Sequence, residues 1–104
     1  MLSAGYAQAD ITPPADVTLQ GYEFRFSQLP PGNDGVHDPL LCRALAFHDG
    51  DKPAVIVSLD ICIVSVAMAR HLRARVAERV GTTPDRVLLC TTHTHSGPDL
   101  DEPQ

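Results

Sequence analysis

The stretch Ala54-Val55-Ile56-Val57-Ser58-Leu59-Asp60 opens the part of the chain that decides the fold. It has the length of a strand, and its almost continuous apolar character predicts burial on both faces of a sheet. From about Ser65 to Val80 the apolar residues recur at helical spacing instead. Val87-Leu88-Leu89-Cys90-Thr91-Thr92-His93 is again of strand length. Strand, helix and strand in this order predict a βαβ unit with two parallel strands.

The end of the predicted helix is marked in the sequence. Gly81 is expected to be the left-handed residue that closes it, and Pro84 prevents any continuation. The face expected to pack on the sheet carries Met68, Ala69, Leu72, Val76 and Val80.

The chain before residue 54 predicts an antiparallel hairpin. Residues 41–47 have strand character, and Asp49-Gly50 is a typical turn signal. In the proline- and glycine-rich first third we expect only a short strand, from about Tyr6 to Ile11, and we expect the acidic tail from Gly97 to Gln104 to be unstructured. The fold class is therefore α/β, a layered domain with a βαβ unit and an antiparallel hairpin in a mixed sheet.

Composition narrows the class of protein. The 104 residues suffice for one domain, and 43% apolar with 20% charged residues is typical of a globular chain. A net charge of −5 with a single lysine argues against a nucleic-acid partner. No signal peptide or transmembrane stretch is visible, so we expect a cytoplasmic protein.

The cysteines Cys42, Cys62 and Cys90 each lie within an apolar stretch. Because their number is odd, we interpret them as reduced, buried thiols in preference to a disulfide.

Two polar groups follow the predicted parallel strands, at the sheet edge where α/β proteins bind ligands. One is Asp60, and the other is Thr92-His93-Thr94-His95-Ser96-Gly97-Pro98. If the second strand persists to residue 95, His93 and His95 project from the same face and can converge on one metal ion or substrate. The alternative is that the two imidazoles only satisfy backbone carbonyls at a strand end. Asp60 can join the two imidazoles as a zinc ligand, or orient the His93 ring or accept a proton, or it can instead cap the helix that begins near Ser65.

Other polar and aromatic residues have plainer interpretations. Asp10 is expected to fix a turn, and Ser96 lacks an acid for a catalytic triad. The loop pair His37-Asp38 can approach the site. Surface positions are expected for His48 and His71, and a role in covering the sheet is expected for Tyr22, Phe24 and Phe26.

Several motifs in this order resemble the N-terminal part of the neutral/alkaline non-lysosomal ceramidases. The resemblance spans nearly the whole chain, and Thr92-His93-Thr94-His95-Ser96-Gly97-Pro98 is its most specific part. The other motifs are Ala9-Asp10-Ile11-Thr12-Pro13, Gly21-Tyr22, Arg43-Ala44-Leu45-Ala46-Phe47 with Asp49-Gly50, and Val57-Ser58-Leu59-Asp60.

The resemblance implies a zinc-dependent amidohydrolase that cleaves an N-acyl, ceramide-like amide bond with metal-activated water. His93 would be a zinc ligand, and His95 would line the catalytic centre and assist the reacting groups. The family's remaining ligands, a distant His, a Glu and a Tyr, have no counterpart within these residues. We therefore expect residues 1–104 to be the N-terminal portion of a larger hydrolase domain, inactive alone, with a small-molecule or lipid amide as its substrate.

The alternative function is a stand-alone binding or assembly module that retains the fold without catalysis. A chain that stops at Gln104 is expected to expose part of its sheet and helix surface and therefore to self-associate.

Overall fold

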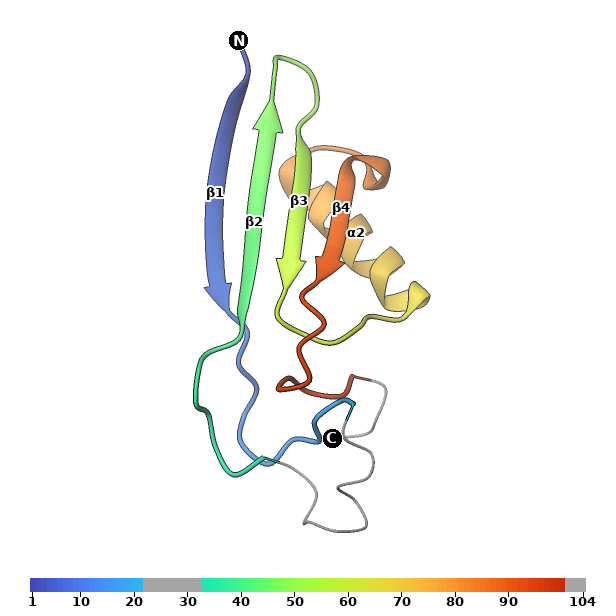
Figure 1. The fold of residues 1–104 in the computed structure, drawn as a ribbon. Coiled ribbons are helices and arrows are strands. Elements are labelled where there is room, and N and C mark those ends of the chain that lie inside the picture. The colour runs from blue at the N-terminus through green and yellow to red at the C-terminus, as the bar shows by residue number, and fades with distance from the viewer. Residues whose placement is uncertain (22–32, 101–104) are drawn as a thin grey trace.

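The computed structural model describes residues 1–21 and 33–100, and within them it shows a four-stranded mixed sheet and one α-helix (Figure 1). The strands lie in chain order; β1, β2 and β3 are antiparallel neighbours, and β3 and β4 are parallel. This arrangement confirms the predicted hairpin and βαβ unit. The elements are β1 (Ser3–Asp10), β2 (Leu41–His48), β3 (Ala54–Leu59), α2 (Val66–Val80), the 3-10 helix η1 (Pro84–Arg86) and β4 (Val87–Thr91).

The helix covers one face of the sheet, and the core lies between the two. Val55, Val57 and Val87 are buried there against Ala77 of α2. The prediction that residues 54–59 are buried on both faces is wrong, because β3 alternates between buried and exposed residues and no described element covers its second face. On that second face Tyr6, Leu45, Ile56 and Leu88 pair across the four strands and are all exposed. We call these four residues the bare row.

The helix begins and ends with the expected signals. The Ser65 side chain accepts a hydrogen bond from the backbone N–H of Met68 at 3.2 Å, which caps the N-terminus. Gly81 is left-handed, with φ of 75°, and its N–H donates to the carbonyl of Ala77. Val80 was expected on the inner face but is exposed, because the buried stripe ends at Ala77 before the chain turns away at Gly81.

Only one cysteine fits the expectation of a buried thiol. Cys62 is buried, Cys42 is half-buried and Cys90 is exposed, and all three are free. Burial raises the pKa of the Cys42 thiol. The prediction is wrong for Cys90 because this residue alternates with Leu89 along β4 and so falls on the same uncovered face as the bare row.

The segment after residue 96 is ordered, against expectation. Gly97, Pro98 and Asp99 are buried, and Pro98 forms an antiparallel bridge with Leu19. The Asp99 N–H donates to the Thr18 carbonyl at 2.7 Å, and the Gln20 N–H donates to the Gly97 carbonyl at 3.2 Å. Backbone pairing with an irregular segment explains the order, since such pairing leaves no periodic signal in sequence. Residues 101–104 lie outside the described residues, as do Tyr22, Phe24 and Phe26.

No helix in the described part of the chain is long and apolar enough to span a membrane.

Candidate functional site

Strand β4 ends at Thr91, two residues before the predicted end, so the condition that the strand persists to residue 95 is not met. The Thr92 N–H still donates to the Leu59 carbonyl at 3.0 Å, and the His93 N–H donates to the Ile61 carbonyl at 3.1 Å. At His93 the backbone then enters the left-handed region, with φ of 63°. A non-glycine residue there costs on the order of 1–3 kcal/mol, and such residues cluster at functional sites.

The two imidazoles nevertheless meet. The ring of His93 lies 5.2 Å from that of His95, centroid to centroid, in an edge-on arrangement. Nδ1 of His93 is 3.1 Å from the backbone carbonyl oxygen of Cys62. Because a carbonyl can only accept, Nδ1 carries the proton in this contact and Nε2 keeps its lone pair. The Thr91 hydroxyl donates to the same carbonyl at 2.9 Å, which helps to hold it in place.

A third candidate ligand, Cys62, completes the cluster. One ligand atom each from Cys62, His93 and His95 lie within 4.8 Å of one another, close enough to hold a metal ion. Thiolate sulfur and imidazole nitrogen are the ligands that zinc prefers, so this donor set fits zinc. Sequence reasoning missed Cys62 because it treated all three cysteines as core residues. Its position, three residues after the end of β3 and at the same sheet edge as the histidines, was the available signal.

Gly21 determines where the ring of His95 can lie. It is left-handed, with φ of 91°, and a Cβ atom at this position would lie 2.2 Å from Nδ1 of His95. Any larger residue would therefore displace the ring. The sequence alone does not explain why residue 21 is a glycine. The structure explains it by the positive φ and by the His95 ring close to the Cα.

Asp60 is engaged by strand β2. Its Oδ2 accepts from the Leu41 N–H at 2.9 Å, and both carboxylate oxygens accept from Nη1 of Arg43 at 3.2 Å. The helix-capping alternative is wrong, because Ser65 caps the helix. The structure brings His93 and His95 together with Cys62, and it gives the carboxylate of Asp60 to Leu41 and Arg43.

A cavity of about 520 Å³ is lined by neighbours of the two histidines in sequence, but Cys62, His93 and His95 are not among its described lining residues. Its described lining includes Thr92, Thr94 and Ser96, which alternate along the chain with the two histidines. Asp60 lines it too, as do His37 and Asp38, whose side chains contact each other at 2.8 Å and are strongly exposed. The hydroxyl-bearing side chains of this segment therefore line the cavity in place of the imidazoles, and the loop pair His37-Asp38 lines the same cavity.

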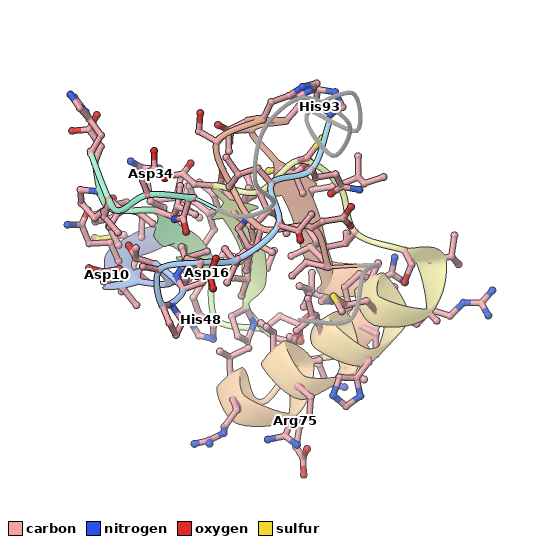
Figure 2. All side chains as sticks on the ribbon, turned by 90° about the horizontal axis from the view of Figure 1, so that it is seen from below. Asp10, Asp16, Asp34, His48, Arg75 and His93 are labelled. Carbon is pink, nitrogen blue, oxygen red and sulfur yellow. The ribbon has the colours of Figure 1, made fainter. Side chains whose placement is uncertain are left out.

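The remaining candidates behave as predicted. Oδ1 of Asp10 accepts from the Thr12 N–H at 2.8 Å, fixing the turn after β1, and hydrogen bonds from Thr12 hold the pKa of Asp10 below its usual value. His48 and His71 are exposed. Figure 2, seen along the strands from the loop end, shows His93 and Arg75 of α2 on opposite sides of the view.

The fold and the cluster define a mixed α/β domain with a Cys-His-His group beyond the ends of two parallel strands. The model of the neutral/alkaline non-lysosomal ceramidase N-terminal region matches residues 2–100. The chain belongs to this family. It is 36% identical over 96 residues to neutral ceramidase A of Dictyostelium discoideum and 33% identical over 98 residues to neutral ceramidase 3 of Arabidopsis thaliana.

Those alignments cover 86% and 90% of this chain but 13% of each relative. Two solved structures agree in fold, each over 94% of this chain and with a TM-score of 0.73. One is a ceramidase complexed with C2, at 29% identity over 15% of its chain. The other is the neutral ceramidase from Pseudomonas aeruginosa, at 31% identity over 16% of its chain. The chain therefore corresponds to a small part of these proteins.

Proposed function

We propose that this chain forms part of a zinc-dependent amidohydrolase that cleaves an N-acyl, ceramide-like amide bond. In this proposal His93 is a zinc ligand and His95 is a catalytic imidazole. The single observation that carries it is the meeting of these two rings, 5.2 Å apart, in a chain of the ceramidase family.

The local geometry supports a metal-ligand role for His93. Ligating histidines usually donate their second ring N–H to a carbonyl or carboxylate, and the contact from Nδ1 to the Cys62 carbonyl at 3.1 Å is of this kind. The left-handed backbone at His93 is energetically unfavourable for a residue other than glycine, and such strained residues cluster at functional sites. In this proposal Asp60 acts at a distance: through Arg43 and Leu41 it fixes the end of β3, from which residues 61 and 62 reach the His93 segment.

Amide hydrolysis adds the hydroxyl of water to the acyl carbon and transfers its proton to the leaving nitrogen as the C–N bond breaks. Zinc, when bound, polarises a carbonyl and lowers the pKa of water from 15.7 to about 7. His95 lies next to His93 and transfers the proton to the leaving amine. The cavity of about 520 Å³, lined by Thr92, Thr94 and Ser96 of the same segment, has a size typical of small-molecule sites.

The test uses the full-length protein that contains this chain. His93→Ala is expected to lose zinc and amide hydrolysis together, whereas His95→Ala loses hydrolysis by on the order of 10²–10⁴-fold and keeps most of the zinc. His71→Ala, an exposed histidine on α2, is the matched control and keeps both. If the His93 and His95 variants retain wild-type turnover, or if the protein binds no zinc, the proposal is wrong.

The alternative, an assembly module, is favoured by one observation, the bare row. Four large side chains in register across the sheet make a continuous apolar strip, which is a typical contact surface. The expected partner is a second copy of the chain. Sedimentation of the wild type against Leu88→Ser tests this: self-association that Leu88→Ser weakens supports the module, and a monomer at high concentration contradicts it.

A further inference from the structure

We propose that Cys62 is a metal ligand, so that the site binds its ion through one thiolate sulfur in addition to imidazole nitrogen. The inference rests on the proposed function for the ligand role of His93, but it concerns a residue that the family resemblance does not assign. It makes the site of this chain a mixed sulfur and nitrogen site.

The distances agree with a shared ion. Sγ of Cys62 is 3.6 Å from Nδ1 of His93 and 3.9 Å from Nε2. In a tetrahedral zinc site, with Zn–S near 2.3 Å and Zn–N near 2.05 Å, sulfur and nitrogen lie about 3.6 Å apart. Sγ is now slightly nearer to Nδ1 than to Nε2, so the side chain of Cys62 must rotate toward Nε2 before the two atoms bind one ion.

Cys62 acts on the imidazole in a second way. Its carbonyl accepts the proton of Nδ1, which leaves Nε2 as the metal-binding nitrogen. One residue thus fixes the tautomer of His93 and also has its thiol sulfur within 4 Å of both nitrogens of the same ring. A cysteine that only filled space under the ring would not need both contacts.

The surroundings of Cys62 favour coordination over packing alone. The residue is buried, with 4% of its surface exposed, while the ring of His93 is exposed, so the cluster is open to solvent on the histidine side. The other two thiols lie on strands: Cys42 is half-buried in β2, and Sγ of Cys90 donates to the Val57 carbonyl at 3.4 Å. Cys62 is the cysteine of the cluster, which makes the other two matched controls. On coordination its thiol proton is released to solvent.

The experiment loads the metal-free full-length protein with Co²⁺, which replaces zinc and reports its ligands in the absorption spectrum. A thiolate ligand gives a sulfur-to-cobalt charge-transfer band in the near ultraviolet. We expect this band in the wild type and in Cys90→Ser, and its loss in Cys62→Ser, with zinc affinity lowered on the order of 100-fold in Cys62→Ser alone. Wild-type Co²⁺ binding without the band overturns the inference and leaves the proposed function standing.

A second measurement needs no variant at Cys62. In the wild type, zinc is expected to slow alkylation of Cys62 at least about tenfold and to leave the alkylation of Cys90 unchanged, as read by peptide mass spectrometry. Equal rates for Cys62 with and without bound zinc contradict the inference. A sulfur band in a protein without amide hydrolysis supports the site and overturns the proposed function, and a protein that binds neither zinc nor Co²⁺ overturns both.

Discussion

A polar residue follows each of the parallel strands β3 and β4, but the contacts of the two side chains differ. Asp60 follows β3. Its carboxylate accepts hydrogen bonds from the Leu41 N–H and from Arg43, and 18% of the side chain is exposed. His93 follows β4 with an exposed ring and a left-handed backbone, and its neighbours Cys62 and His95 are close enough to hold a metal ion with it. A polar side chain at the carboxyl end of a parallel strand therefore indicates a binding or catalytic role only when structural hydrogen bonds do not already occupy its polar atoms.

The largest effect on stability is expected at Asp60. Asp60→Ala removes the acceptor of the Leu41 N–H and of the Arg43 guanidinium, and it should lower the free energy of unfolding by about 2–3 kcal/mol. Glu78→Ala, at an exposed carboxylate on α2, is the control and should change it by less than about 0.5 kcal/mol. Urea unfolding measures both. A loss below that of the control would mean that Asp60 is not a structural residue.

Gly21→Ala tests how the fold positions the histidines after β4. The added Cβ meets the His95 ring at 2.2 Å on a backbone with φ of 91°, so the variant should lose about 1–2 kcal/mol and shift the imidazole resonances of His95. Gly5→Ala is the control, because nothing lies within 4 Å of its Cβ position. Unchanged His95 resonances in Gly21→Ala would contradict the contact.

At His93 the comparison predicts a difference between two variants that both lack the ring. Glycine adopts a positive φ without steric cost, and alanine does not. His93→Gly should therefore be about 1 kcal/mol more stable than His93→Ala in urea, while both lose the metal. Equal stabilities would show that the left-handed backbone is not strained.

Asp10, a second acid at a strand end, should show the smallest effect. Hydrogen bonds with the Thr12 side chain and N–H lower its pKa from the usual 3.8. A lowered folded-state pKa contributes stability that is present above the unfolded value and is lost as the pH falls through the folded one. Asp10→Asn should therefore flatten the fall in stability below about pH 4. A variant with the wild-type acid profile would contradict this role.

The sequence predicts elements well where one local rule governs them. The bounds of β3 agree with the prediction, and Ser65 and Gly81 lie at the helix ends because capping is a local property. His93 and His95 meet for a different reason from the predicted one: the strand stops at Thr91, and hydrogen bonds with Ile61 and Cys62 position the turn. Burial at Ile56 depends on what covers the sheet, and contacts of Cys62 and Gly21 join distant segments, so no local pattern reveals them.

The bridge between Leu19 and Pro98 has a consequence for the order of folding. It joins residues that lie far apart in sequence, 19 and 98, whereas the βαβ unit forms from residues close in sequence. Closing a long loop costs entropy before its contacts compensate, so long-range pairings tend to form late. Gly21 follows this bridge, and its backbone lies close to the His95 ring. We therefore expect the histidine cluster to acquire its final geometry after the sheet has formed. Metal uptake during refolding should therefore lag behind the recovery of secondary structure.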